Sequence, residues 1–200
     1  YFKGMNTLAP KILLIKPSGS SGLAFAIEPI PLSLEYIASS LIQNVEGFTR
    51  KHIRIIDMFK EHTDLEKHLK SFSPDMVGIT MSATEHNNGI KILKAVKKFN
   101  DKILCIAGGY HPAGIPEVML NEGFDVVSRT DGEVVHVELA KGKKLREIKG
   151  ISFWENGKIV HNDIEHESLV QNLDEYPFPA RYLRRYEYKN LFLRDRVFDQ

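Results

Sequence analysis

The sequence is poor in cysteine: its 200 residues include one, Cys105. A single cysteine excludes disulfide scaffolds, zinc ribbons and metal clusters held by several thiolates within this chain. Cys105 lies in the apolar run 103–107, which favours a small buried side chain over a reactive one. The chain also lacks the roughly 18–20 consecutive apolar residues of a membrane span, and no signal sequence opens it. We therefore expect a cytoplasmic protein with no membrane span.

An excess of charge is also missing, because 27 Lys and Arg residues balance 26 Asp and Glu residues and leave a net charge of +1. This balance favours neither nucleic acid nor an anionic membrane as a partner. The last 20 residues interleave Arg with Tyr, as some RNA-binding tails do, but the acids Glu187, Asp195 and Asp199 dilute their charge. We expect no nucleic-acid partner.

Several motifs that mark catalytic or phosphate sites are absent. The sequence has no G-x-G-x-x-G, no Walker loop, no H-E-x-x-H and no G-x-S-x-G. A phosphoacceptor signalling domain needs Asp after the third strand, where residues 80–82 are Thr, Met and Ser. One polar stretch does contain a set of ligand-type side chains: His161, Asp163, His166 and Glu167. Because this stretch follows a predicted hairpin, a solvated loop is favoured over a metal site.

The sequence does contain short apolar runs that alternate with helical patterns. Five runs predict strands: residues 12–15, 53–56, 76–80, 103–107 and 125–127. Amphipathic spacing predicts helices between them: after Pro31, over 64–72 and 88–99, near Pro116 and after Gly132. The alternation predicts a flavodoxin-like, doubly wound α/β domain with a five-stranded parallel sheet.

The pattern changes after residue 149, where two short apolar runs flank Asn156-Gly157. Asn-Gly between such runs predicts a β-hairpin. Beyond it, the proline-punctuated segment 173–181 predicts an extended linker. We therefore divide the chain into four parts: an expression-tag remnant (1–4), the α/β domain (11–147), the β-hairpin (148–162) and the linker (163–200).

In an open parallel sheet, ligands bind where the carboxyl ends of the strands meet the following loops. The first such loop contains Ser18, Gly19 and Ser20, whose backbone can approach a phosphate or a flat ring closely. The second contains Ser82 and Thr84, which can bind a ligand or simply cap the next helix. The first two loops are therefore candidates for binding, each with a structural alternative.

The third loop pairs Gly108 with Gly109, which removes two side chains where a backbone turns or a ligand presses against it. His111 follows as a candidate ligand, acid-base group or plain surface residue. In the fourth loop, Gly132 and Glu133 begin a helix, where the helix dipole alone favours an acid.

Together, these segments resemble the N-terminal cobalamin-binding domain of cobalamin-dependent radical S-adenosylmethionine enzymes. The resemblance is carried by an ordered set: Pro17, then 31–38, 75–80, 108–112 with 116–117, and 132–133. The hairpin and the segment 173–181 look like the connector that precedes the radical domain in those enzymes. The resemblance covers about residues 11–190.

The resemblance implies that cobalamin is the cofactor and that the whole enzyme methylates an unactivated carbon of a small-molecule substrate. The C-x-x-x-C-x-x-C run for a four-iron cluster is absent, so the cluster and S-adenosylmethionine would belong to a downstream domain beyond Gln200. We expect the fragment alone to be inactive. Two alternatives stay open: an oxidative cyclase of the magnesium-protoporphyrin ester cyclase type, and a stand-alone flavodoxin-like nucleotide-binding module.

The resemblance also suggests how cobalamin would bind. Residues 16–22 lack the D-x-H-x-x-G of methionine-synthase-type domains, so we expect base-off cobalamin without that histidine as a ligand. Ser82 and Thr84 would hydrogen-bond the nucleotide tail, and Gly108 and Gly109 would give it room. His111 would be a neighbour of the lower face of the corrin.

Overall fold

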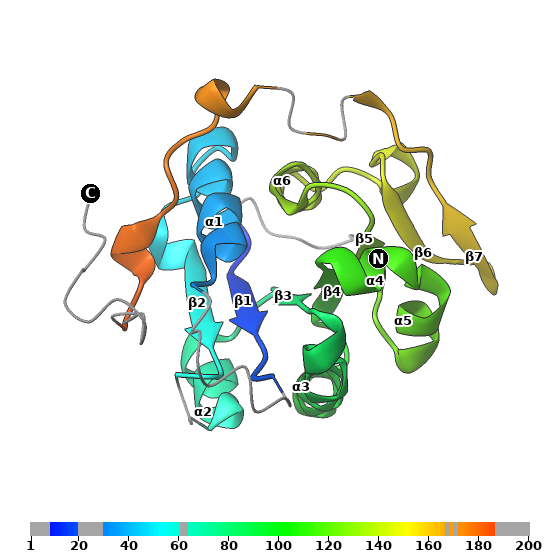
Figure 1. Cartoon of the computed structure of the whole chain (residues 1–200), viewed down its shortest axis with the longest axis horizontal. Helices are drawn as coiled ribbons and strands as arrows, with labels where there is room; N and C mark the ends of the chain where they lie inside the picture. Colours follow the sequence, from blue (N-terminus) through cyan, green and yellow to red (C-terminus); the bar gives the residue numbers. More distant parts are fainter. Residues whose placement is uncertain (1–8, 20–29, 61–63, 167–168, 170–171, 187–200) are drawn as a thin grey trace.

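The structure is a computed structural model that describes residues 9–19, 30–60, 64–166, 169 and 172–186 (Figure 1). The described chain forms one mixed sheet with the strand order β2-β1-β3-β4-β5-β6-β7. Its strands are β1 (Ile12–Lys16), β2 (Ile53–Asp57), β3 (Met76–Thr80), β4 (Leu104–Gly108), β5 (Val126–Ser128), β6 (Ile151–Glu155) and β7 (Lys158–His161). Strands β2-β1-β3-β4-β5 pair in parallel, which confirms the flavodoxin-like prediction.

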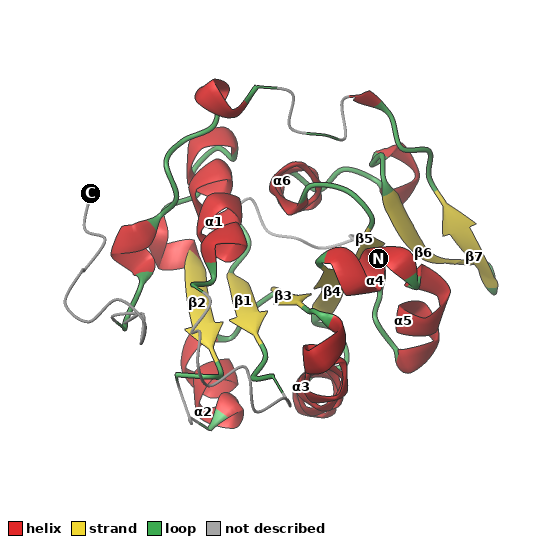
Figure 2. Cartoon of the chain, viewed as in Figure 1, coloured by secondary structure: helices red, strands yellow, loops and turns green. Residues whose placement is uncertain are grey.

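Helices cover both faces of the sheet (Figure 2). They are α1 (Leu32–Asn44), α2 (Leu65–Phe72), α3 (His86–Phe99), α4 (Tyr110–Gly114), α5 (Pro116–Glu122) and α6 (Gly132–Ala140). Buried side chains of α1 and α6 form one core on one face, and those of α2, α3 and α5 form a second core on the other. The short helix α4 was not predicted from the sequence.

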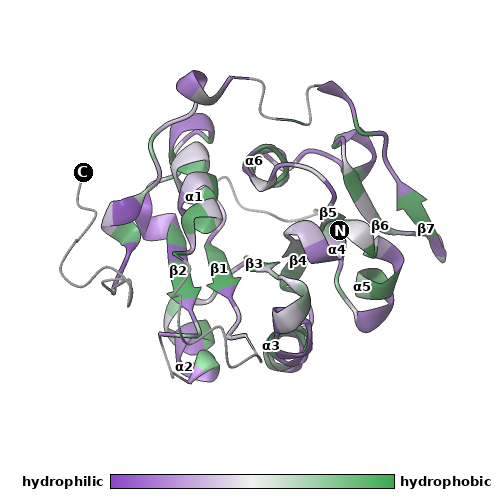
Figure 3. Cartoon of the chain, in the orientation of Figure 1, coloured by the Kyte–Doolittle hydropathy of each residue, from purple (hydrophilic) through white to green (hydrophobic). Residues whose placement is uncertain are grey.

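The central strands are apolar toward both faces, as covered parallel strands must be. In β1, Ile12 and Leu14 belong to the core under α1 and α6, whereas Leu13 and Ile15 belong to the opposite core. Figure 3 shows this apolar character along β1 and β2. Because the side chains alternate strictly, the last residue of each strand also faces a defined side, which positions the candidate site.

The predicted hairpin is confirmed, and it continues the same sheet instead of standing apart. Strand β6 pairs antiparallel with β5 and with β7. Asn156 and Gly157 form the turn with φ values of 50° and 76°, the left-handed conformations that a tight hairpin turn requires.

The described part of the predicted linker folds back over α1. The backbone N–H of Ala180 donates to the carbonyl of Glu35 at 3.0 Å, and Ala180 is fully buried. Arg184 then binds the buried carboxylate of Glu35. The predicted tag remnant lies outside the described residues. Among the helices of the described chain, none is long and apolar enough to cross a membrane.

Candidate functional site

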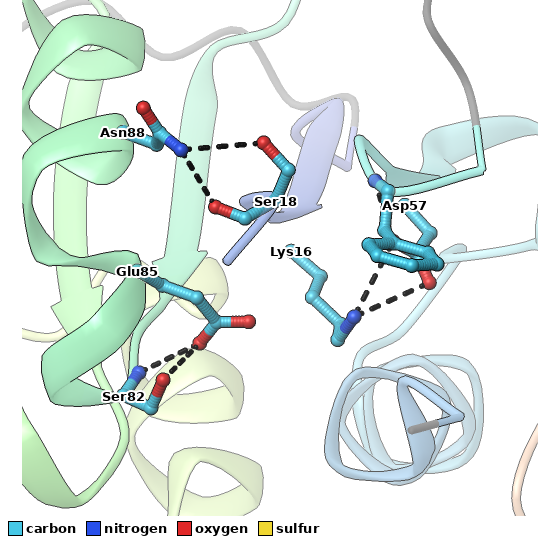
Figure 4. Close-up of polar contacts among 7 residues, drawn as sticks. Lys16, Ser18, Asp57, Ser82, Glu85 and Asn88 are labelled. Atoms are coloured by element: carbon cyan, nitrogen blue, oxygen red, sulfur yellow. Dashed lines mark hydrogen bonds and ion pairs between the residues drawn. The ribbon is translucent and has the colours of Figure 1, made fainter. Parts of the chain in front are cut away.

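The carboxyl ends of β1 and β3 lie side by side, although the chain visits β2 between them. At this point the order of strands reverses, and the loops after β1 and β3 diverge to opposite faces of the sheet. In open α/β sheets, ligands bind in the crevice that such a reversal creates. Figure 4 shows the residues of this edge.

The last residues of the parallel strands form a row on the face covered by α1 and α6. Side chains along a strand point to the two faces in turn, so each of these residues faces the same side as the residue two positions before it. Those earlier residues lie in or against the core under α1 and α6. The row consists of Asp57, Lys16, Thr80, Gly108 and Ser128. The residues two positions earlier on the same face are mostly apolar and belong to the core. The row therefore marks the boundary between this core and the polar carboxyl ends of the strands.

Lys16 and Asp57 form an ion pair that the sequence analysis missed. Lys16 Nζ lies 3.4 Å from Asp57 Oδ1, and their side chains are 10% and 3% exposed (Figure 4). Asp57 also accepts the backbone N–H of Phe59 at 3.0 Å. The charge of Lys16 is thus balanced within the fold. The sequence did contain a signal for this pair, because Lys16 directly follows one predicted strand and Asp57 directly follows the next.

The loop after β1 is tied to α3 across the strand reversal. Asn88 Nδ2 donates to the carbonyl of Ser18 at 2.8 Å and to its Oγ at 3.3 Å (Figure 4). The structure therefore places Ser18 beside the first turn of α3. Gly19 follows it half-buried, and Ser20 lies outside the described residues.

Ser82 forms a capping box with Glu85 at the turn before α3, the structural role that the sequence analysis had weighed against binding. The backbone N–H and the hydroxyl of Ser82 donate to Glu85 Oε2 at 2.7 and 2.8 Å. Ser82 Oγ also lies 3.1 Å from Thr84 Oγ1. Both side chains remain exposed at the edge of the sheet, so capping does not remove them from reach of a ligand.

The two glycines after β4 have different roles. Gly109 has φ +95°, and a Cβ on it would lie 2.8 Å from the carbonyl oxygen of Met81, so the fold itself requires glycine there. A Cβ on Gly108 would meet no described atom within 4 Å. Gly108 therefore leaves open space on the face covered by α1 and α6, at the end of β4.

His111 pairs with a second histidine, His86, at the start of α3. Its Nε2 lies 3.0 Å from His86 Nδ1, and the two rings are nearly perpendicular, at 83°. Both residues are half-buried. The sequence analysis named His111 without its partner, because nothing in the pattern shows that two residues 25 positions apart meet.

At the start of α6, Gly132 lets this helix approach α1, because a Cβ there would lie 2.7 Å from Ile37 Cδ1. Burial, and to a lesser extent the charge of Asp131, raises the pKa of Glu133. Glu133 lines a polar cavity of about 320 Å³ together with Tyr176. The structure thus gives Gly132 a packing role and places Glu133 in the groove beside α1.

His136, one turn further along α6, is a buried polar residue that the sequence analysis missed. Its Nδ1–H donates to the carbonyl of Gly132 at 2.8 Å, and its Nε2 has no hydrogen-bond partner among the described residues. Burial lowers its pKa to about 4, so the ring is neutral and Nε2 is an acceptor. A Cβ on Gly78 would lie 2.7 Å from Nε2, which explains glycine in the middle of β3.

The ligand-type stretch after the hairpin forms no metal centre in the described residues, where no three candidate ligands gather. His161 instead contacts Ser152 Oγ at 2.8 Å and Glu117 Oε1 at 3.2 Å. Glu167 lies outside the described residues.

Comparison with known proteins agrees with this geometry. Residues 23–140, more than half of the chain, match the B12 binding domain family. The chain is also 33% identical over 181 residues to the uncharacterized methyltransferase PH0819 of Pyrococcus horikoshii, a match that covers 85% of this chain and 38% of that protein.

Solved structures show the same fold. The cobalamin-dependent S-adenosylmethionine radical enzyme OxsB, with aqua-cobalamin and S-adenosylmethionine bound, matches with a TM-score of 0.71 and 23% identity over 86% of this chain and 24% of that one. The radical S-adenosylmethionine methyltransferase TsrM of Kitasatospora setae matches with a TM-score of 0.60 and 19% identity over 78% of this chain and 30% of its own. The chain therefore belongs to the B12-binding domain family, and it resembles the cobalamin domains of cobalamin-dependent radical S-adenosylmethionine enzymes.

Proposed function

We propose that this chain holds cobalamin for a larger radical S-adenosylmethionine enzyme that transfers a methyl group to an unactivated carbon of a small-molecule substrate. The relative PH0819 is named a methyltransferase, and so is TsrM. The chain spans 38% of PH0819 and 30% of TsrM. The iron–sulfur cluster and the S-adenosylmethionine site are accordingly proposed for the remainder of such an enzyme.

The open position over Gly108 is the observation that carries this proposal. Cobalamin is bulky and carries a nucleotide tail, so it needs a place at the strand ends where no side chain obstructs it. Gly108 leaves such a place between the ends of β3 and β5, on the face covered by α1 and α6. One row deeper, the buried Nε2 of His136 is an acceptor with no donor among the described residues. A space with a polar rim and one free acceptor suits the tail of this cofactor.

The residues of this chain would bind and orient the cofactor, while cobalamin itself supplies a transferable methyl group on cobalt. Ser82 and Thr84, exposed at the edge, would donate hydrogen bonds to the nucleotide tail. Lys16 would not bind the nucleotide tail, because its ammonium group is already paired with Asp57. The described end of β1, residues 16–19, has no imidazole, which supports base-off binding without a histidine from that loop.

A titration tests the proposal. The purified chain is incubated with hydroxocobalamin and desalted, and bound cobalt is then quantified beside an absorption spectrum. We expect nearly one cobalt per chain and a base-off spectrum. FMN in a parallel titration tests the nucleotide-module alternative, since retained FMN with no retained cobalt would contradict the proposal.

A further inference from the structure

We propose that His136 Nε2 accepts a hydrogen bond from an O–H or N–H group on the nucleotide tail of the bound corrinoid, the class of cofactors to which cobalamin belongs. This inference rests on the proposed function and deepens it, because it names an atom that reads the chemistry of the tail. His136 would then favour corrinoids whose tail carries a donor at this depth over those that carry none.

The hydrogen bond at the start of α6 fixes the tautomer of His136. Its Nδ1 lies 2.8 Å from the carbonyl oxygen of Gly132, and a carbonyl can only accept, so Nδ1 carries the proton. The residue is 3% exposed, and burial keeps the ring neutral by lowering its pKa to about 4. Nε2 therefore presents a lone pair, and no described residue donates to it.

A buried acceptor without a donor is unfavourable, because the hydrogen bonds that it makes to water in the unfolded chain are not replaced. The surroundings of Nε2 do not call for a polar group. Nε2 lies over Gly78, whose partners on the two neighbouring strands are Leu14 and Ile106. Both belong to the apolar core under α1 and α6. An apolar side chain would fill this place without the cost, so the imidazole points to a donor that arrives with a ligand.

This acceptor lies next to the open position at Gly108. The strand register pairs Thr80 with Gly108, and Gly78 is two residues before Thr80 on the same face. Nε2 is thus one strand across and one row deeper than the space over Gly108. The imidazole fills the place of a side chain at Gly78, whereas no described atom fills the place at Gly108. A group that enters over Gly108 and extends toward β3 would therefore meet Nε2.

The tail of a corrinoid offers two kinds of donor, a ribose hydroxyl and, in some corrinoids, an N–H group of the base. The dimethylbenzimidazole of cobalamin has no N–H, because one ring nitrogen bears the ribose and the other has a lone pair that base-off binding leaves free. Two lone pairs cannot form a hydrogen bond with each other. Adenine, in contrast, carries an exocyclic amine that can donate. The ribose hydroxyl and the base amine are thus the two sources of the donor.

Binding measurements with three corrinoids test the inference. The full chain and its His136→Leu variant are titrated with cobinamide, which lacks the nucleotide tail, with cobalamin, and with a cobamide whose base is adenine. Leucine keeps an apolar side chain of similar size but has no acceptor. We expect His136→Leu to bind cobinamide as the unmodified chain does. It should bind at least one of the tailed corrinoids about tenfold more weakly, because the donor of that tail is left unpaired.

The pattern of losses identifies the donor. A loss for both tailed corrinoids would assign it to the ribose hydroxyl, and a loss for the adenine-bearing cobamide alone would assign it to the base amine. The control is Val137→Ala, which changes the next buried residue of α6 and removes no hydrogen-bonding atom, and it should keep all three affinities.

Two results would overturn the inference: affinities of His136→Leu that are undiminished for both tailed corrinoids, and an equal loss for all three corrinoids, which would show a general structural role. Both leave the proposed function intact, because the unmodified chain still binds its cofactor. Failure of the unmodified chain to bind any of the three corrinoids would instead overturn the proposed function and, with it, the role of His136.

Nuclear magnetic resonance gives a second readout that needs no variant. In a chain labelled with ¹⁵N-histidine, the unprotonated Nε2 of His136 is assigned through its bonds, and its resonance shifts to lower frequency when this nitrogen accepts a hydrogen bond. We expect this shift on addition of a tailed cobalt(III) corrinoid and not on addition of cobinamide. A resonance that no bound tailed corrinoid moves, or that cobinamide moves equally, would overturn the inference.

Discussion

Arg184 and Glu35, 149 positions apart in the sequence, form a two-pronged ion pair in which Arg184 Nε and Nη2 lie 2.8 and 2.9 Å from the two carboxylate oxygens. The Glu35 side chain is 1% exposed, and that of Arg184 is 21% exposed. This pair fastens the segment after the hairpin onto α1, whose first turns also flank the candidate site.

Removing Arg184 should destabilise the fold, because the carboxylate of Glu35 would stay buried without its partner. We expect Arg184→Met to lower the free energy of unfolding by about 2–3 kcal/mol, somewhat less than for a fully buried pair. Urea denaturation measures this loss. The double variant Glu35→Gln/Arg184→Met should recover part of it, and a double variant as unstable as the sum of the two single variants would contradict the pairing.

The neighbouring glycines after β4 should respond differently to the same substitution. Gly109→Ala forces an L side chain into φ +95° and against the carbonyl of Met81. We expect a loss of about 2–4 kcal/mol from strain and overpacking. Gly108→Ala enters open space and should change stability by about 0.5 kcal/mol or less. Thermal unfolding of both variants checks this contrast, and equal losses would contradict the different roles of the two glycines.

His136 should make stability depend on pH. Burial lowers its pKa from 6.5 to about 4, so the unfolded chain binds a proton below pH 6.5 that the folded chain does not. The stabilisation is complete above pH 6.5 and falls as the pH drops toward 4, by about 3 kcal/mol in total for this residue.

The variant His136→Leu isolates this contribution. Its stability between pH 7 and 4, measured by urea denaturation, should fall less steeply than that of the unmodified chain. Val137→Ala, which changes the next buried residue of α6 and removes no titratable group, should keep the original slope. A slope in His136→Leu equal to that of the unmodified chain would show that His136 titrates normally.

The fold could be predicted because its signals are local. Apolar runs of about five residues mark covered parallel strands, and Asn156-Gly157 marks the hairpin turn. The edge that carries the candidate site follows from strand order, so Ser18, Ser82 and Gly108 could be named in advance. The structure then showed that the two neighbouring glycines differ. The backbone requires glycine at 109, whereas Gly108 leaves open space.

Pairings between distant elements could not be predicted from local patterns. The contact of His86 with His111 depends on how α3 and α4 leave the sheet, and the pair of Lys16 with Asp57 depends on the register of β1 against β2. His136 looks like one more residue of a helix until α6 is placed over Gly78. In each case the signal is a distance in space, which one sequence does not contain.

The central claim is that cobalamin occupies the space over Gly108, and the most direct test is to fill that space. Gly108→Leu is compared with Gly114→Leu, since a Cβ at Gly114, at the end of α4, also meets no described atom within 4 Å. After incubation with hydroxocobalamin and desalting, bound cobalt per folded chain is measured for both variants. We predict that Gly108→Leu loses at least tenfold in retained cobalt while Gly114→Leu retains as much as the unmodified chain. Full retention by a folded Gly108→Leu variant would contradict the account.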